Sequence, residues 1–287
     1  MTETKRILLL SDLHVGSKWA LWPPGFTSPN ARSDMTDEIP QNAVNAAIWA
    51  HWKKMLAYLK KERPDCIILN GDLIEGNQHR EYGRGLMTPD IGVQMEACIK
   101  VIKTLPKVPM YFTAGTDYHQ LKDGTNVDLA ISKTFNADFG DELVVEECGI
   151  RLFCRHAIGI SNSSWQYMAT APGRDQMLLV LNKSEEKYGP IDVAVFSHRH
   201  QFVAPQFRSG IALVTPCWQG KTVFAVKKGI VGVPDIGWVM LHISENWIAV
   251  DASGIATVVR PCKVVGRDVG RLPIFPHRPT EKGGRKK

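Results

Sequence analysis

The chain has 287 residues, of which 44% are hydrophobic and 22% charged, with a formal net charge of +6. This composition is that of a globular protein, and the length suits one large α/β domain or two small ones. No apolar run reaches the roughly 18 residues of a membrane span, and the N-terminal run is too short for a signal-peptide core, so we expect a cytoplasmic protein without a membrane partner.

The first half of the chain alternates between strands and helices. Residues 7–10 form an unbroken aliphatic run, which indicates a strand buried on both faces. A helix is expected over residues 41–62, a strand over 65–70, a helix over 91–103 and a strand over 108–114. The apolar residues that define the first helix, at spacings of three and four, are Val44, Ile48, Trp52, Met55 and Leu59. This order favours a parallel sheet with helices on its faces.

The second half reads mainly as strands. A helix is expected over residues 126–135, a hairpin from 142–147 and 150–156, and a helix over 175–187. A strand ending at "VAVFSHRH" comes next. Later strands are predicted over 201–207, 211–216, 221–226, 237–243, 247–252 and 256–260. No internal repeat and no clear linker divides the globular part, so one domain with two packed sheets is the simplest interpretation.

Polar residues with metal-binding side chains follow the buried strands. Asp12 and His14 follow the first strand, Asp72 follows the second, His156 ends the hairpin, and His198 and His200 close "VAVFSHRH". Ligands of α/β sheets bind beyond the carboxyl ends of strands, so these residues are expected to converge. In an extended segment residues i and i+2 point to the same side, which would aim each pair at one place.

Each of these residues also has a simpler explanation when it is taken alone. Asp12 and Asp72 could be turn acids bonded to backbone, and the two histidines of "SHRH" could be a structural pair. Their common placement after strands favours a metal site. Mixed carboxylate and imidazole ligands suit manganese, iron, zinc or nickel.

Four sequence blocks together resemble the calcineurin-like metallophosphoesterases: "SDLHVGS", "NGDLIEG", "RHAIG" and "FSHRHQ". The resemblance covers Arg6 to about Trp218. It implies a four-layer α/β/β/α sandwich of two mixed sheets flanked by helices. It also implies two divalent transition-metal ions, with manganese the first expectation, at the strand ends. Asp12, His14 and His200 would hold one ion, His156 and His198 the other, and Asp72 would bridge them.

The block "GTDYH" departs from this family, which usually has Gly-Asn-His followed by an acid. Thr116 stands where the family has the metal-binding asparagine, and His119 lies two positions beyond the usual histidine. The block is similar to a variant in phage-type members. We expect Thr116 or Asp117 to complete the second metal shell, and the catalytic His119 to stabilise the phosphate or protonate the leaving oxygen. The alternative is a loop that has lost its catalytic role, leaving a weakened or single-metal site.

The resemblance implies a metal-dependent phosphoesterase. A metal-bridging hydroxide would attack phosphorus in line, and loss of Asp72 should be most damaging because it touches both ions. Candidate phosphate-binding residues are Arg84, Arg155 and Arg199, whereas Arg80 and Arg174 are expected to be surface ion-pair partners. Trp19, Trp22, Phe26 and Trp165 could stack on a base or pack against the body.

The C-terminal residues 260–287 contain nine basic and two acidic residues, which leaves residues 1–259 nearly neutral. We expect residues 1–259 to form the metallophosphoesterase domain and residues 260–287 a basic, flexible arm. Such an arm could bind nucleic acid, or it could be a solvated tail. A phosphodiester of nucleic acid or a nucleotide is therefore the favoured substrate. The alternatives are phosphomonoesterase activity on a small molecule and a non-catalytic, polyanion-binding protein.

The six cysteines are scattered without a CxxC pair. This spacing indicates free thiols and gives no sign of a zinc ribbon or a disulfide framework.

Overall fold

The computed structural model describes residues 4–29, 36–77, 83–121, 123–158, 168–181, 188–207, 210–229, 232–245 and 247–257. The predicted basic arm, Arg80 and Trp165 lie outside these residues, as does the predicted boundary at residue 259. No helix in these ranges is both long enough and apolar enough to span a membrane.

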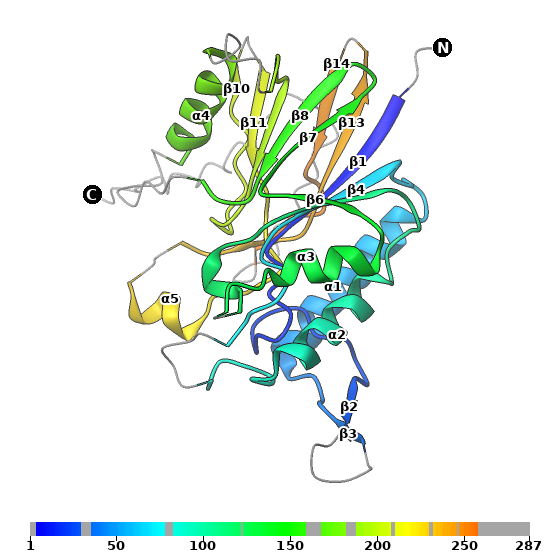
Figure 1. Cartoon of the computed structure of the whole chain (residues 1–287), viewed down its shortest axis with the longest axis vertical. Helices are drawn as coiled ribbons and strands as arrows, with labels where there is room; N and C mark the ends of the chain where they lie inside the picture. The colour runs from blue at the N-terminus through cyan, green and yellow to red at the C-terminus, as the bar shows by residue number, and fades with distance from the viewer. Residues whose placement is uncertain are drawn as a thin grey trace, which may run out of the picture.

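The first sheet is built on the predicted parallel strands and has the order β14-β13-β1-β4-β5-β6 (Figure 1). Strands β1 Thr4–Leu10, β4 Cys66–Asn70, β5 Met110–Thr113 and β6 Asp138–Gly140 run parallel. From the end of the chain, β13 Val239–Ser244 pairs antiparallel with β1, and β14 Trp247–Asp251 pairs antiparallel with β13. The sheet is therefore mixed, and the predicted parallel core is confirmed.

The second sheet has the order β10-β11-β9-β8-β7. The predicted hairpin is formed by β7 Glu142–Glu147 and β8 Ile150–Arg155, and β8 runs parallel to β9 Val193–Phe196. Strand β11 Gly210–Val214 is parallel to β9, and the short β10 Gln206–Phe207 closes the edge. This sheet is also mixed.

The alternation of side chains along the strands produces the layers. On β1, Ile7 and Leu9 belong to an apolar core shared with Leu152 and Val193 of the second sheet, so this core lies between the sheets. Leu8 and Leu10 point to the opposite face and join the core beneath the helices. These helices are α1 Ala43–Leu59, α2 Ile91–Ile102 and α3 Val127–Thr134, while α4 Thr170–Leu181 packs beside β9 and β11 of the second sheet. The predicted α/β/β/α sandwich is confirmed.

Helix α1 follows its predicted pattern with one exception. The side chain of Asn42 caps the helix by accepting from the backbone N–H groups of Val44 and Asn45. Ile48, Trp52 and the two later apolar positions are buried, whereas Val44 in the first turn is exposed. The predicted stripe therefore begins one turn later than expected.

Three predictions of secondary structure were inaccurate. Of the strand expected over residues 201–207, only β10 Gln206–Phe207 is formed, with an isolated bridge at Val203. Residues 221–226 were expected to be a strand but lie in helix α5 Val223–Lys227, where the Thr222 hydroxyl accepts from the N–H of Ala225 and starts a helical turn. Helix α4 begins at Thr170, five residues before the predicted start. Its first turn accommodates Pro172, which lacks the N–H that a first turn leaves unused.

Several short elements lay outside the prediction. Besides β6, these are the hairpin β2 Thr27–Pro29 and β3 Thr36–Glu38, the strand β12 Asp235–Ile236, and the 3-10 turn η1 Asp117–His119. The partner of β12, β15 Ala256–Thr257, lies within the strand predicted over 256–260. Five cysteines in the described ranges are free thiols, as predicted, and Cys262 lies outside them.

Candidate metal centre

The predicted ligands lie in loops that leave the carboxyl ends of four strands. Asp12 and His14 follow β1 and Asp72 follows β4, both in the first sheet, whereas His156 follows β8 and His198 and His200 follow β9 in the second. Backbone hydrogen bonds join the first two loops, from Asp12 N to Gly71 O at 3.0 Å and from His14 N to Asp72 O at 3.1 Å. The two sheets thus contribute to one site.

The backbone of the ligand loops is left-handed and not extended. The φ angles are 49° for Asp12, 44° for His14, 52° for Asp72, 72° for His198 and 56° for His200. The expectation that alternation along extended segments aims the ligand pairs is therefore wrong. Each such residue costs on the order of 1–3 kcal/mol, which the surrounding hydrogen bonds must offset.

Two glycines allow the loops to approach closely. A Cβ on Gly71, which has a φ of 77°, would lie 2.6 Å from His156 Nδ1 and 2.7 Å from Gly115 Cα. A Cβ on Gly115 would overlap the carboxylate of Asp72 and lie 2.9 Å from Asp128 Oδ2. Both positions therefore require glycine for the site to close.

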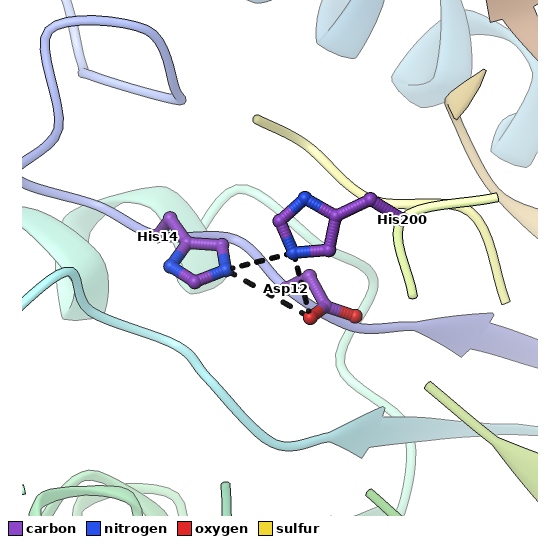
Figure 2. Close-up of side chains that lie close together, drawn as sticks. All are labelled: Asp12, His14 and His200. Carbon is purple, nitrogen blue, oxygen red and sulfur yellow. Dashed lines mark hydrogen bonds and ion pairs between the residues drawn. The ribbon is translucent and has the colours of Figure 1, made fainter. Parts of the chain in front are cut away.

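The first group of donor atoms comes from Asp12, His14 and His200 (Figure 2). His200 Nε2 is 3.2 Å from Asp12 Oδ1 and 3.2 Å from His14 Nε2, while His14 Nε2 is 3.8 Å from the same carboxylate oxygen. Figure 2 shows the two imidazole rings and the carboxylate pointing toward one another across the end of β1. This is the ligand set that the resemblance implies for one ion.

Asp72 is the centre of two further groups of donors. His156 Nε2 lies 2.9 Å and His198 Nδ1 lies 3.9 Å from Asp72 Oδ2, and these three residues form the second predicted set. His119 Nε2 lies 3.8 Å from the same oxygen and forms a third set with Asp72 and His14. The sharing of Asp72 and His14 between sets makes the centre continuous.

Thr116 acts on Asp72 through hydrogen bonds. Its backbone N–H donates to Asp72 Oδ1 at 2.7 Å, and its hydroxyl lies 3.1 and 3.2 Å from the two carboxylate oxygens. In this structure Thr116 therefore contacts the carboxylate of Asp72, whereas the prediction made Thr116 a metal ligand. Asp117, the other candidate, is exposed and belongs to none of the donor groups found among the described residues.

Contacts behind the rings of three histidines direct Nε2 toward the centre: hydrogen bonds for His156 and His119, and an ion pair for His14. His156 Nδ1 is 2.6 Å from the carbonyl oxygen of Asn70, His119 Nδ1 is 2.6 Å from the carbonyl oxygen of Glu75, and His14 Nδ1 is 2.9 Å from Glu75 Oε2. Metal-binding histidines are typically held in this way by an acceptor behind the ring. The donor set therefore has the orientation that a metal site needs.

Three buried side-chain atoms at the centre, Asp12 Oδ1, His14 Nδ1 and His156 Nε2, make no hydrogen bond to the described residues and have only ion-pair contacts within the centre. Unsatisfied buried polar atoms are costly, and the histidine and carboxylate types present are ligands of transition metals. The residues therefore fit divalent metal ions.

The two carboxylates of the centre are held in the ionised form. Burial alone would raise the pKa of Asp12, but His156 and His200 outweigh it and keep this pKa well below its usual value. In the same way His156 and His119 outweigh burial and lower the pKa of Asp72. Both side chains are thus prepared to bind cations.

Neighbouring acidic groups raise the pKa of three histidines of the centre. Burial alone would lower the pKa of His14, but Glu75 and Asp12 raise it to about 10. Burial would likewise lower the pKa of His200, but Cys217 and Asp12 raise it to about 10. At His156, Asp72 and Asp12 outweigh burial and raise the pKa to about 9. For His119 burial prevails and lowers the pKa.

Several supporting residues were not found from the sequence. Glu75 is buried and, besides holding His14, accepts from Gln219 Nε2 at 2.6 Å. Asp128, at the start of α3, accepts from the N–H groups of Leu73 and Gly115 and so ties the Asp72 loop to the Thr116 loop. For Asp128 the only signal in the sequence was an acid in the first turn of a predicted helix, and such acids are too common to indicate a functional role.

A buried polar network lies beneath the centre and links the sheets. Its members are Ser11, Asn70, Thr113, Ser197 and Thr215, all with no exposed surface. Asn70 accepts from Thr113 and donates to Ser197, whose hydroxyl lies 2.6 Å from that of Thr215. Thr215 in turn contacts Ser11, which donates to Asp12 Oδ2 at 2.6 Å. The network fixes Asp12 from behind.

The predicted phosphate-binding arginines differ in position. Arg155 is engaged by Glu142 at 3.4 Å and Asp175 at 2.9 Å, so its guanidinium is not available to a substrate in this structure. Arg174 also pairs with Asp175, as expected of a surface ion pair. Arg199 lies between two ligands and its pKa is lowered by burial, whereas the side chain of Arg84 is exposed.

The aromatic loop after the first ligand pair is mainly packed into the body. Trp22 and Phe26 are buried with ring centroids 5.1 Å apart, and Trp22 Nε1 donates to the carbonyl of Ile39. Packing is therefore the correct interpretation for these two rings. Trp19 is partly exposed.

Comparison with protein-family models and with curated proteins finds no match. Solved structures with similar folds include Zn²⁺-bound wild-type Vps29 from Entamoeba histolytica (12% identity, TM-score 0.44, 88% of this chain and 93% of that chain). A second is a predicted phosphoesterase from Streptococcus pneumoniae (12% identity, TM-score 0.40, 90% of this chain and 91% of that chain). A third is a structure described as a novel archaeal phosphodiesterase (13% identity, TM-score 0.43, 86% of this chain and 98% of that chain). Similarity at this level does not identify the activity of the chain.

Proposed function

We propose that this chain is a metal-dependent phosphoesterase with two divalent transition-metal ions at the ends of its sheets. The observation that carries the proposal is the position of Asp72, whose carboxylate belongs both to the donor set with His156 and His198 and to the set that contains His14. A carboxylate shared in this way is the arrangement of a two-metal site, in which paired ions stabilise the attacking and leaving oxygens of a phosphate ester.

Asp12, His14 and His200 would hold one ion and His156 and His198 the other, with Asp72 between them. When bound, such ions lower the pKa of water toward neutrality and offset charge on the phosphate oxygens. The protein supplies rigid positions for these ligands: Thr116 fixes the carboxylate of Asp72, and the Ser11 hydroxyl fixes that of Asp12. Burial of both carboxylates excludes bulk water from the ligand side.

Manganese is the first candidate for the metal, with iron, zinc and nickel as alternatives. The four imidazole and two carboxylate side chains are compatible with all four metals, and cellular supply decides among them. The all-oxygen ligand set that calcium prefers is absent from this group of residues.

The proposed substrate is a phosphodiester of nucleic acid or a nucleotide. Its support is the charge distribution of the sequence, because the basic residues of 260–287 would attract a polyanion to a nearly neutral body. Arg199, partly buried between two ligands, is the arginine best placed to contact a phosphate. A phosphomonoester remains the alternative substrate class.

The test is hydrolysis of bis-p-nitrophenyl phosphate and p-nitrophenyl phosphate with Mn²⁺, and again after chelation. The native chain, Asp72→Asn and His242→Ala are compared; His242 lies on β13 opposite Arg6, outside the donor groups, and serves as the control. Metal-dependent diester cleavage that is lost only in Asp72→Asn is the expected result. Preferential monoester cleavage would reverse the substrate class, and absence of cleavage with Mn²⁺ bound would favour the polyanion-binding alternative.

A further inference from the structure

His119 is positioned as part of the metal centre. The side chain is only 12% exposed, and its Nε2 lies 3.8 Å from Asp72 Oδ2. Its ring meets that of His14 edge to face, with centroids 4.6 Å apart and an interplanar angle of 73°. The donor atoms of His119, His14 and Asp72 all lie within 4.8 Å of one another, close enough to surround one ion.

The hydrogen bond behind the ring of His119 determines what its Nε2 can do. Nδ1 lies 2.6 Å from the carbonyl oxygen of Glu75, and a carbonyl oxygen only accepts, so Nδ1 carries the proton. In the neutral ring Nε2 then has a lone pair and no hydrogen. His156 has the same arrangement through the carbonyl of Asn70. In this neutral form the Nε2 lone pair is directed at the centre and can bind a metal ion, whereas protonation of a leaving oxygen would require the imidazolium form.

One residue holds both histidines of this donor group. The Glu75 carboxylate contacts His14 Nδ1 at 2.9 Å, and its carbonyl oxygen holds His119. The next residue, Gly76, has its N–H and carbonyl bound by the side chain of Gln94. A Cβ on Gly76 would lie 3.2 Å from His119 Cα, so the two loops are in close contact. His119 is therefore fixed in its orientation.

Thr116, at the position where the resemblance places a metal-binding asparagine, directs its hydroxyl to Asp72 instead. The turn η1 then brings His119 back to the centre, closed by hydrogen bonds from His119 N to Thr116 O and from Gln120 N to Asp117 O. The same block thus brings an imidazole donor to the centre three residues after position 116.

We infer that His119 is a metal ligand, binding through Nε2 the ion shared by His14 and Asp72, and is not the proton donor that the sequence suggested. The inference rests on the proposed two-metal function. It means that "GTDYH" supplies an imidazole to the ion of His14, whereas the amide of the resembled family belongs to the ion of His156 and His198.

The experiment is a titration of chelator-treated protein with Mn²⁺ by calorimetry, with metal content checked by elemental analysis. The variants are His119→Ala, His119→Asp and the control His242→Ala. We expect two ions in the native chain and the control, and binding of one ion weakened by at least about 100-fold in His119→Ala. Most of this loss should be recovered in His119→Asp, because a carboxylate binds a metal but holds no proton to donate near neutral pH.

The outcomes separate the inference from the function on which it rests. Native affinity for both ions in His119→Ala would overturn the ligand role and restore the proton-donor role. Equal loss in His119→Ala and His119→Asp would also overturn it, since damage to the loop would then explain the loss. Failure of the native chain to bind Mn²⁺ would instead overturn the proposed two-metal function.

Discussion

Glu75 is the buried acid on which the orientation of His14 depends, and Glu75→Gln tests that role. The substitution keeps the shape of the side chain and removes its charge. In the native structure Glu75 Oε2 is 2.9 Å from His14 Nδ1 and 2.6 Å from Gln219 Nε2. Glutamine can preserve one of these contacts but not the attraction to a protonated imidazole.

The expected loss follows from the burial of this contact. Glu75 is 6% exposed and His14 2% exposed, so water screens the interaction little. A hydrogen bond to a charged group contributes about 1.5–3 kcal/mol, which is the expected decrease in the free energy of unfolding of the metal-free protein at pH 6. Removal of a group that holds a metal-binding histidine should also weaken Mn²⁺ binding by about 10–100-fold.

The pH dependence of this loss has a definite sign. Burial would lower the pKa of His14, but Glu75 and Asp12 raise it from 6.5 to about 10. A raised pKa in the folded state gives stability that is fully present below pH 6.5 and is lost as the pH rises through 10. The difference between native protein and Glu75→Gln should therefore be largest at pH 6 and should decrease toward pH 10.

The assay is urea unfolding of chelator-treated protein at pH 6, 8 and 10. Glu62→Gln is the matched control, because Glu62 is partly exposed and its ion pair with Arg6 at 3.5 Å is screened by solvent, so the change should be below about 0.5 kcal/mol. If Glu75→Gln is as stable as native protein at pH 6, or if its deficit grows with pH, the proposed support of His14 by Glu75 is incorrect.

Three further predictions concern the centre and the arm. Gly115→Ala should remove tight Mn²⁺ binding and destabilise the protein by about 1–3 kcal/mol, because the added Cβ would overlap the side chain of Asp72. Calorimetry measures the binding and urea unfolding measures the stability. Mn²⁺ binding as tight as in the native chain would contradict the described geometry. Metal binding at pH 7.5 should release about three protons, because the raised pKa values of His14, His156 and His200 keep these rings protonated without metal. Calorimetry in buffers of different ionisation enthalpy measures the number of protons released. Metal binding without proton release would contradict the raised pKa values. Deletion of residues 278–287 should weaken DNA binding and reduce the slope of log affinity against log salt concentration by up to about 4. An unchanged slope would show that this part of the arm does not contact DNA.

Much of the fold, and the convergence of the six residues proposed as principal ligands, could be predicted because both depend on local patterns. A strand buried on both faces must be apolar, so "ILLL" and "CIIL" mark the parallel core of the first sheet, and the polar residues after them lie at its carboxyl end. The short segment at 221–226 could not be assigned in this way. Its apolar residues have no long periodicity, and two of them, Val223 and Val226, are exposed in α5.

The remainder of the site depends on tertiary proximity, which a sequence pattern does not contain. Glu75, Asn70 and Asp128 act through contacts with loops from other elements, and nothing in their own neighbourhoods predicts those contacts. The left-handed backbone of the proposed ligands was also missed, because this conformation is uncommon for residues other than glycine, even for aspartate and histidine, which are enriched in it. Arg155 was assigned to substrate for its position beside His156, but its acidic partners come from β7 and α4.

The distribution of ligands over both sheets has a consequence for how the protein is made. Contacts such as that between His14 and His200 join residues 186 positions apart, and His198 and His200 follow β9 late in the chain. During synthesis Asp12, His14 and Asp72 leave the ribosome well before these two histidines. A nascent chain that ends before β9 would therefore lack part of the proposed ligand set, and the proposed ions could be bound by the full set only after the second sheet closes against the first.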